Sequence, residues 1–496
     1  MDSGSNISDL VVIGGGINGT GIALDAAGRG LNVLLCEQGD LASATSSNSS
    51  KLIHGGLRYL EHYDFRLVRE SLAEREVLLH KAPHLIKPMR FRIPHRPHLR
   101  PAWMIQLGLF LYDHLSKRVT LKSSSGIKFG RYSPLLPHIK RGFEYSDGWV
   151  DDSRLVVLNA VAARQKGADI RTQTRCINIK RFNRLWHITL ENVNTGDTEK
   201  VRARALVNAA GPWVSSLYQD AMQKKAPKQV RLIKGSHIVV PRIHTEEEAY
   251  LLQNKDGRVV FLIPFEDKFT LIGTTDIEYK EDPSNVVISQ LEIDYILGIS
   301  NEHFKHQLTA ADVCWAFSGV RPLLDDESDS PQAVTRDYTF EVDAPAGMAP
   351  ILSVFGGKLT TYRKLSELAV DDLVEYFEHA GPAWTMQSTL PGGDFKDQAS
   401  LQAQLNSNYP WLPIELCARY VRSYGTLIYQ ILRDAKVLTD LGQHFGAGLY
   451  ALEVNYLVTH EWACNVDDIL WRRSKLGLFL STTEKANLAD YLQTRT

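Results

Sequence analysis

A stretch rich in side chains that could do chemistry runs from Ser46 to Arg66 and reads SSNSSKLIHGGLRYLEHYDFR. It combines serine hydroxyls with a lysine, a histidine and an arginine. Hydroxyls and backbone amides in such a run can bind a pyrophosphate or the polar edge of a flat ring. The pair Gly55-Gly56 would let the backbone lie against that ring. Arg58 and Tyr59 would then point toward whatever sits on it.

The elements that must position this stretch can be read from the first forty residues. The apolar run Leu10–Ile13 predicts a buried parallel strand, and Asn18–Ala27 predicts a helix that glycines end. Asn32–Cys36 predicts a second buried strand, which Glu37 follows. The strand, helix and strand form a βαβ unit, so a parallel sheet is expected here.

The turn between the first strand and the helix carries the pattern G-x-G-x-x-G, at Gly14, Gly16 and Gly19. The first glycine permits a tight turn, the second lets the backbone approach a pyrophosphate, and the third lets helix and strand pack closely. The helix N-terminus favours phosphate, and Glu37 can accept hydrogen bonds from a ribose. The pattern predicts dinucleotide binding and leaves NAD and FAD open. A second such pattern is not found.

Composition sets the limits for the whole chain of 496 residues. Its 44% hydrophobic content is enough for two or three domains, and its formal net charge of −1 argues against a nucleic-acid partner. The five cysteines are scattered and odd in number, which favours reduced thiols and a cytosol-facing protein. The polar, acidic start does not resemble a signal peptide. No apolar run reaches 18 residues, so no membrane-spanning helix is expected.

Several further pieces carry a resemblance to a known family. In order they are GGGINGTG, ATSSNSSKLIHGGLRYLE, GFEYSDGWVDD, NAAGPW, RLIKGSHIVVP, GTTDIEY, SGVRPLLDDESDSPQAVTRDY and SVFGGKLTTYRK. Together they resemble the bacterial aerobic FAD-dependent glycerol-3-phosphate dehydrogenases over essentially the whole chain. The glycine motifs are shared by many flavoproteins of the D-amino-acid-oxidase type. The Arg-Tyr, Lys-Gly-Ser-His and Gly-Val-Arg-Pro pieces are more diagnostic.

The resemblance implies oxidation of sn-glycerol 3-phosphate to dihydroxyacetone phosphate, with hydride transfer to flavin N5 and electrons passed to a membrane quinone. The substrate phosphate carries a charge near −2, and guanidinium groups bind such oxygens in pairs. Arg58, Arg321 and Arg336 are the candidates, and Tyr59 could add a hydroxyl donor. Arg321 follows the apolar run 313–317, which places it at a buried strand end. A surface salt bridge is the alternative role for any one of these arginines.

The substrate hydroxyl needs a base, and two residues compete for that role. His237 begins an apolar strand, has an ordinary pKa near 6.5, and resembles the base proposed in the family. Lys358 is the alternative base, or a partner for the developing alkoxide. A structural histidine is the other reading of His237. His54 is interpreted as structure beside the flavin.

The resemblance also implies a set of FAD contacts. Gly356, Gly357, Leu359 and Thr360 form a second flavin-binding stretch, whose following helix would stabilise an anionic reduced flavin. NAAGPW contributes Ala210 and Gly211, although it could also be a plain strand exit. The other cofactor contacts are Gly14, Gly16, Gly19, Glu37, Thr45, Ser46, Ser50, Lys51 and Leu52. No metal site is predicted.

The window from Lys81 to Arg141 holds thirteen lysines and arginines against one acid, Asp113. The window is therefore +12 and the rest of the chain −13. At its centre lies the apolar, aromatic-flanked segment Trp103–Leu115, which is too short to span a bilayer. Basic flanks around such a helix favour an anionic membrane surface. A core helix with solvated arginines is the plain alternative, and a nucleic-acid patch is disfavoured because no binding module accompanies it.

These observations predict an α/β fold with a Rossmann-type FAD-binding domain, a mixed-sheet substrate domain and a helical C-terminal domain. Residues 1–387 should hold the two interleaved domains, with a membrane-associating basic segment near 90–120, and 388–496 the helices. The expected protein is peripheral on the cytoplasmic face of the inner membrane and homodimeric. A soluble glycerol-3-phosphate oxidase that makes hydrogen peroxide is the alternative, and a non-enzymatic flavin-binding or scaffolding protein is the third reading.

Overall fold

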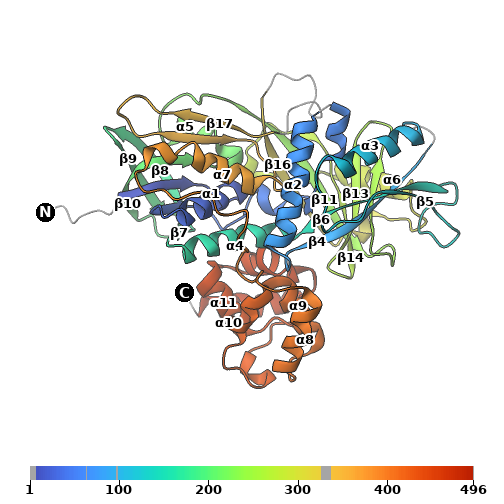
Figure 1. Ribbon diagram of the computed structural model, residues 1–496. Helices are drawn as coiled ribbons and strands as arrows, with labels where there is room; N and C mark the ends of the chain where they lie inside the picture. The colour runs from blue at the N-terminus through green and yellow to red at the C-terminus, as the bar shows by residue number, and fades with distance from the viewer. Residues whose placement is uncertain (1–6, 63, 97–98, 326–336, 495–496) are drawn as a thin grey trace.

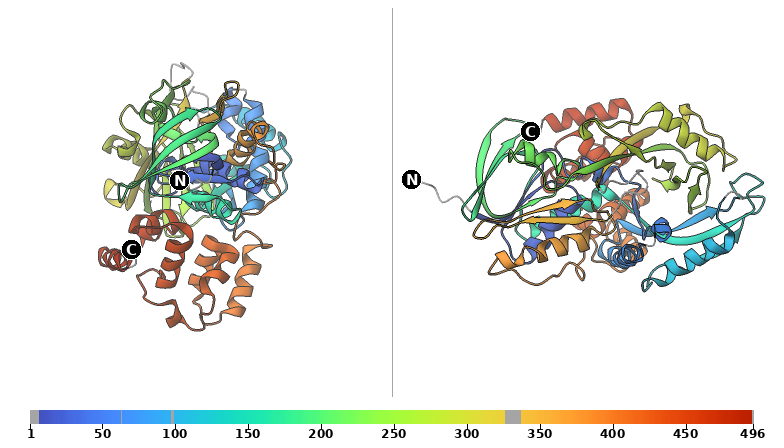
Figure 2. Two further views of the ribbon diagram at one scale, coloured as in Figure 1. Left: turned by 90° about the vertical axis from the view of Figure 1, so that its left-hand side faces the viewer. Right: turned by 90° about the horizontal axis from the view of Figure 1, so that it is seen from above.

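The structure is a computed structural model that describes residues 7–62, 64–96, 99–325 and 337–494; the side chains of residues 58, 61 and 62 are not described. Two sheets lie side by side, and a lobe of C-terminal helices sits below them in Figure 1. Figure 2 shows the same lobe from two further directions. The fold class predicted from the sequence is thus confirmed.

The first sheet is largely parallel and begins with the predicted βαβ unit. β1 pairs in parallel with β2 and β10, β10 with β18, and β2 with β7, while β17, β9 and β8 add antiparallel strands. The strands are β1 (Ile7–Ile13), β2 (Val33–Cys36), β7 (Asp169–Arg171), β8 (Thr174–Phe182), β9 (Leu185–Asn192), β10 (Thr198–Asn208), β17 (Thr339–Asp343) and β18 (Ile351–Phe355).

Alternating side chains of this sheet enter two cores. Leu10 and Val12 of β1 pack with the helices α1 (Ile17–Gly28), α4 (Asp152–Gln165) and α7 (Tyr362–Asp371) on one face. Val11 and Ile13 pack on the other face, against β8, β9 and α5 (Ser216–Asp220). A parallel strand buried on both faces must be apolar throughout, which explains the unbroken run at 10–13.

The second sheet is mixed and carries the substrate-domain strands. Its order is β15-β11-β14-β13-β12-β4-β6-β3, with β16 added to β11 and β5 to β6. The strands are β3 (Leu52–Ile53), β4 (Ile86–Pro94), β5 (Ser125–Lys128), β6 (Arg141–Val150), β11 (Val230–Pro241), β12 (Ala249–Gln253), β13 (Val259–Phe265), β14 (Phe269–Gly273), β15 (Ile277–Glu278) and β16 (Trp315–Leu324).

Three helices accompany the second sheet, and the C-terminal lobe has its own apolar core. The helices beside the second sheet are α2 (Phe65–Lys81), α3 (Ala102–His114) and α6 (Gln290–Asn301). The lobe contains α8 (Gln398–Asn408), α9 (Ile414–Tyr424), α10 (Ile428–Leu432), α11 (Ala451–Glu461) and α12 (Thr482–Gln493). Within the described residues, no helix is both long and apolar enough to cross a membrane.

Two sequence interpretations need correction. His237 was expected to begin a strand, but β11 starts at Val230 and places His237 well inside it. Arg321 was expected at a strand end, but β16 continues to Leu324 and places Arg321 inside the strand, opposite Ile233. Pro322 does not stop the strand, because β16 pairs only with β11 among the described strands. A proline is tolerated on an edge strand, where its missing N–H is not needed by a second neighbour.

Candidate functional site: a dinucleotide cradle beside a His–Arg face

The glycine turn brings backbone segments closer than any side chain would allow. Gly14 has a φ of +114°, and a Cβ there would lie 2.5 Å from the carbonyl oxygen of Ala209 on the neighbouring segment. A Cβ on Gly19 would lie 1.9 Å from the Gly14 oxygen. The first and third glycines therefore set the close approach of β1, β10 and α1, as the motif requires.

The N-terminus of α1 opens onto a cavity of about 960 Å³ between the first sheet and β16. Glycine-rich turns, the loop after β2 and the turn after β10 line one side, while Phe317 to Val320 line the other. The predicted cofactor residues that line it are Gly14, Gly16, Glu37, Thr45, Ser46, Ala210, Gly211, Gly356 and Gly357. The volume lies at the upper end of the usual range for ligand sites.

Glu37 stands at the end of β2, where a ribose would be expected. Its Oε2 accepts the Gly15 N–H at 2.7 Å, and its Oε1 accepts the Gly39 N–H at 2.8 Å. Burial raises the pKa of the Glu37 carboxyl, although these backbone N–H groups oppose the rise. Each carboxylate oxygen has a second lone pair, so Glu37 can hold the turn and still accept from a ligand hydroxyl.

The hydroxyls after β2 join the two sheets. Thr45 Oγ1 donates to the Val320 carbonyl at 2.6 Å, and Ser46 Oγ accepts the Ile17 N–H at 3.0 Å. Ser46 thus occupies one of the free N–H groups at the start of α1. These contacts place the loop between the glycine turn and β16.

The other predicted cofactor residues do not line this cavity. Thr360 Oγ1 accepts the His54 N–H at 3.1 Å. This bond joins the stretch around Gly356 and Gly357 to the Ser46–Arg66 stretch. Leu52 is buried in β3, and Leu359 packs against the main core. Lys51 is fully buried, with its Nζ 2.7 Å from Asp152 and 3.0 Å from the Ser47 carbonyl. Burial lowers the pKa of Lys51, and the charge of Asp152 opposes this.

His237 and Arg321 lie on the same face of the second sheet. His237 is opposite Phe317 and Arg321 is opposite Ile233, so alternation puts both side chains on one side. Glycines occupy nearby positions of this face: a Cβ on Gly235 would meet the Arg321 guanidinium at 2.5 Å, and one on Gly273 would meet the His237 ring at 2.3 Å. The glycines leave room for the side chains of His237 and Arg321.

His237 is buried and held between two neighbours. Its Nε2 lies 2.9 Å from Ser50 Oγ, and its ring stacks on Phe317 with the ring centroids 4.9 Å apart. Its Nδ1 has no hydrogen-bond partner among the described residues. Burial, together with the positive charges of Arg321 and Lys51, lowers the pKa of His237 well below its usual value. The lowered pKa keeps the imidazole neutral, with a nitrogen lone pair for a proton, but makes the ring a weaker base than an exposed histidine.

Arg321 is held in place by two side chains that the sequence reading did not single out. Its Nη1 is paired with Asp276, and its Nη2 donates to Thr274 Oγ1 at 3.0 Å. Both partners belong to the GTTDIEY piece. A guanidinium has five donors in a rigid plane, so these two contacts fix its orientation.

The remaining predicted substrate residues are placed unevenly. Lys358 Nζ lies over the Tyr59 ring, 3.9 Å from its centroid, so these two residues are brought together. The side chain of Arg58 and the whole of Arg336 lie outside the described residues. His237, Arg321, Lys358 and Tyr59 do not line the large cavity, but Phe317, against which His237 stacks, does.

Sequence reasoning missed residues whose role depends on distant partners. Asp152 accepts from Ser49 and pairs with Lys51, about a hundred positions away. Asn48 lines the cavity and lies against Gly319, where a Cβ would come within 2.7 Å. Asp276 orients Arg321. One sequence signal was available: KGSH, IGTT and SGVR each place a glycine within or beside an apolar run, which indicates that another group packs closely against that strand.

The cradle fits FAD. The glycine approach, the helix N-terminus, the acid after β2 and the size of the cavity suit a dinucleotide, and the cavity extends to β16, beside the His–Arg face. A flavin end placed there would meet the second glycine stretch at Gly356 and Gly357. The fold and this site define an FAD-dependent oxidoreductase.

Comparisons with known proteins agree. The model of the FAD dependent oxidoreductase family matches residues 9–363, and that of the C-terminal domain of alpha-glycerophosphate oxidase matches residues 383–493. The glycerol-3-phosphate dehydrogenase of Pseudomonas aeruginosa is 59% identical over 490 residues, 99% of this chain and 96% of that protein. The aerobic glycerol-3-phosphate dehydrogenase of Escherichia coli (strain K12) is 57% identical over 98% of this chain and 97% of its own length.

The D-erythritol 1-phosphate dehydrogenase of Brucella abortus is 49% identical over 97% of both chains. Among solved structures, the glycerol-3-phosphate dehydrogenase from Bacillus halodurans complexed with FAD has a TM-score of 0.75 at 26% identity, covering 99% of this chain and 94% of that one. The chain belongs to the family of FAD-dependent glycerol-3-phosphate dehydrogenases. The predicted family and cofactor are confirmed.

Proposed function

We propose that the protein oxidises sn-glycerol 3-phosphate to dihydroxyacetone phosphate. The observation that carries this is the shared face of His237 and Arg321. One residue can take a proton and the other can bind a phosphate, and both lie next to the loop that lines the cofactor cavity. The names of the 59% and 57% identical relatives support this substrate.

The chain's own residues divide the work as follows. Arg321, oriented by Asp276 and Thr274, binds the substrate phosphate, and Arg58 and Arg336 are the further candidates for it. Neutral His237 takes the hydroxyl proton, while Lys358 beside Tyr59 stabilises the developing alkoxide or serves as the base instead. Bound FAD supplies the hydride acceptor at its N5 atom. Gly14 and the other residues of the cavity would hold the FAD next to the sheet face that carries His237 and Arg321.

An anaerobic titration tests the substrate. The purified yellow protein is mixed with sn-glycerol 3-phosphate and, separately, with D-erythritol 1-phosphate, and the flavin absorbance is followed. Bleaching at lower concentrations of sn-glycerol 3-phosphate supports the proposal. Preferential bleaching by the four-carbon phosphate would move the assignment toward the Brucella abortus relative. If neither ester bleaches an intact flavin, the substrate assignment must be withdrawn.

We further propose that α3 attaches the protein to an anionic membrane surface. Trp103, Leu107 and Phe110 are 65%, 50% and 56% exposed and recur on one face of the helix. Met104 and Leu111 widen this apolar face. The opposite side of α3 is anchored, because Tyr112 is buried and donates to Asp147 at 2.8 Å. An apolar face of this size is typical of an interaction surface.

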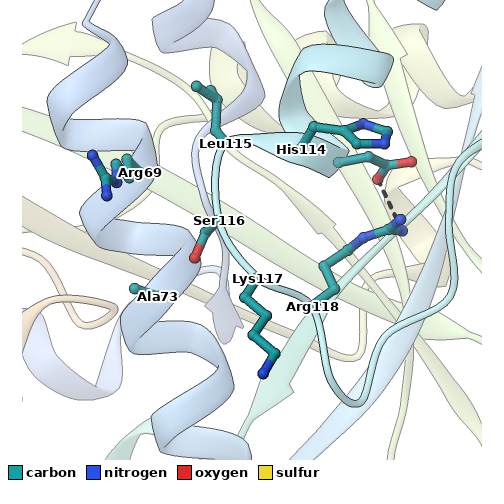
Figure 3. Close-up of a pocket in the computed structure, with 8 residues that line it drawn as sticks. Arg69, Ala73, His114, Leu115, Ser116, Lys117 and Arg118 are labelled. Atoms are coloured by element: carbon teal, nitrogen blue, oxygen red, sulfur yellow. Dashed lines mark ion pairs between the residues drawn. The ribbon is translucent and has the colours of Figure 1, made fainter.

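Positive charge accompanies the apolar face. A cavity of about 540 Å³ between α2 and the segment after α3 is lined by Arg69, Lys117 and Arg118 (Figure 3). Its acid, Asp113, is engaged by Arg118 at 3.3 Å and by Ser124. Exposed bases continue along the β5–β6 hairpin, at Lys122, Lys128, Arg131, Lys140 and Arg141. Such bases attract anionic lipid at about 1 kcal/mol each.

Part of the +12 counted in the window is already neutralised. Arg90 and Arg92 pair with Glu144, and Arg92 also with Glu246 and Glu248. Arg96 pairs with Glu302. Glu144 lies just past the end of the window and the other three acids lie much further along the chain, so the charge offered to a membrane is smaller than the sequence count suggests.

Co-sedimentation with vesicles tests the attachment. The double variant Trp103→Ser/Phe110→Ser should lose binding to vesicles that contain anionic lipid at low salt. Phe182→Ser is the matched control, since Phe182 is 65% exposed on β8, at the other end of the molecule in Figure 1. If the wild-type protein stays in solution, or if both variants bind equally, α3 is not the attachment site.

We propose that the electron acceptor is a membrane quinone. We also propose that the protein lies on the cytoplasmic face of the inner membrane and forms a homodimer. The alternative is an oxidase that passes electrons to oxygen. The oxidase alternative is retained because the L-alpha-glycerophosphate oxidase from Mycoplasma pneumoniae shares the fold, with a TM-score of 0.60. Fast reoxidation by a soluble quinone with little peroxide supports the dehydrogenase, and stoichiometric peroxide supports the oxidase. Analytical ultracentrifugation tests the dimer.

A further inference from the structure

Three cations near the end of the chain insert into the N-terminal half. Arg473 is fully buried and forms two parallel contacts with Asp40, Nη1 to Oδ2 and Nη2 to Oδ1, each 2.7 Å long. Arg472 also pairs with Asp40. Lys475 Nζ lies 2.9 Å from Asp151 and donates to Ser153 Oγ at 2.6 Å. A fourth buried pair, Arg154 with Glu461, crosses the same boundary.

Asp40 belongs to the loop that lines the cofactor cavity. Gln38 and Gly39 before it and Ala42 and Ser43 after it all face that cavity. The loop is held on one side by backbone contacts to the glycine turn, such as the Ala42 N–H to the Gly15 carbonyl at 3.1 Å. Arg472 and Arg473 hold the same loop through Asp40. The path of the loop therefore depends on the C-terminal domain.

Asp151 belongs to a second segment that reaches the site. Its neighbour Asp152 accepts from Ser49 Oγ at 2.7 Å and pairs with Lys51. Ser50, between these two, contacts His237. Lys475 thus fixes the start of α4, and α4 fixes the serine run that meets the base.

The contact between the C-terminal domain and the N-terminal half is made by buried ion pairs, and these pairs indicate a role other than attachment. Burying an ion pair contributes little net stability, and apolar residues of similar volume would attach the domain as well or better. A two-pronged arginine–carboxylate contact adds defined geometry instead. The carboxylates that receive the C-terminal cations, Asp40 and Asp151, lie in or directly beside segments that reach the cofactor cavity and His237.

We propose that the C-terminal domain is a positioning element for the FAD-binding loop, with Arg473 and Lys475 as positioning residues. Arg473 sets the loop at 38–43 through Asp40, and Lys475 sets the run 49–51 through Asp151 and α4. This role concerns cofactor binding and does not depend on the substrate or electron acceptor proposed above.

FAD affinity of the reconstituted full-length protein tests the proposal. Arg473→Met keeps the length of the side chain and removes its charge, and FAD binding is measured by quenching of flavin fluorescence. We expect a dissociation constant raised about tenfold or more, with faster hydrogen exchange in residues 38–50, as for a lost supporting contact. Arg473→Lys should restore part of the affinity.

The matched control breaks a buried pair inside the C-terminal domain. Arg419→Met removes the partner of Glu453, whose two contacts with Arg419 are 2.7 and 2.6 Å, without touching the loop. It should lower the unfolding temperature and leave FAD affinity unchanged. Equal loss of FAD affinity in both variants, or unchanged affinity in Arg473→Met, overturns the proposal. Should Arg473→Met not fold, the double variant Asp40→Asn/Arg473→Met removes both charges, and the same comparison applies.

Discussion

The Nε2 atom of His237 lies 2.9 Å from the hydroxyl oxygen of Ser50, across the boundary between the second sheet and the loop of the cofactor site. This contact fixes the ring beside Phe317, and Ser50 in turn stands between two residues bound by Asp152. The position of His237 and the position of the cofactor loop are therefore set by the same few contacts.

The first prediction concerns His237→Gln. Glutamine keeps a polar group in the site but cannot take up the substrate proton, so flavin reduction should slow by about 10²- to 10⁴-fold. Anaerobic stopped-flow absorbance measures the rate, and the flavin spectrum checks that FAD is retained. Lys358→Met is the comparison. If His237→Gln reduces FAD at nearly the wild-type rate while Lys358→Met does not, the lysine is the base.

Much of the fold was accessible from local patterns. The G-x-G-x-x-G turn with its flanking apolar runs predicted α1 and β2 to within one residue and β1 to within three. The strand that contains His237 was found for the same reason, since buried strands are apolar whichever residues they later meet. Local sequence carries this information because it depends on burial rather than on partners.

The site depended on contacts that no local pattern contains. Asp276 reaches Arg321 and Asp152 reaches Lys51 only after β14, β16 and α4 are assembled. The same reason explains why the charge count overstates the free charge of the basic window, because Glu144 and Glu246 pair with Arg92 from outside that window. The strand around Arg321 was ended too early because Pro322 reads as a breaker when the edge position of β16 is not known.

The second prediction concerns Arg321→Lys. Lysine keeps the charge but loses the planar fork that Asp276 and Thr274 orient, so the phosphate should bind less tightly. Loss of one charged hydrogen bond, about 1.5–3 kcal/mol, corresponds to a KM raised about 10- to 150-fold. Steady-state kinetics with an artificial acceptor measure it. Arg231→Lys on β11, which alters an exposed pair with Glu278, should leave KM unchanged. Equal KM values in both variants would refute the assignment.

The third prediction concerns Asp152→Ala. The variant leaves the Lys51 ammonium buried without its main partner, and such a loss typically costs about 3–5 kcal/mol of stability. The midpoint of urea unfolding should fall accordingly. Glu191→Ala removes the partner of the exposed Arg175 and should cost at most about 1 kcal/mol. Similar midpoints for the two variants would contradict the prediction, because they would show that the Lys51 ammonium is hydrated or finds another partner when Asp152 is removed.

The last prediction concerns pH and His84. This residue is buried at the junction with the C-terminal domain, against Phe395, and neither ring nitrogen has a hydrogen-bond partner among the described residues. Burial, with a smaller effect from the charge of Arg154, lowers the pKa of His84 to about 3. In the unfolded chain the pKa is about 6.5.

Between these two values the unfolded chain holds a proton that the folded chain does not. Stability is therefore lost as the pH falls below about 6.5, by about 1.4 kcal/mol per unit. His84→Leu removes this loss, so the free energy of unfolding of the variant should gain about 2 kcal/mol relative to wild type between pH 7.5 and pH 5. Urea unfolding at both pH values measures the difference. His138→Leu, at an exposed position, should show no such change. If His84→Leu follows the wild-type pH dependence, His84 is protonated in the folded protein.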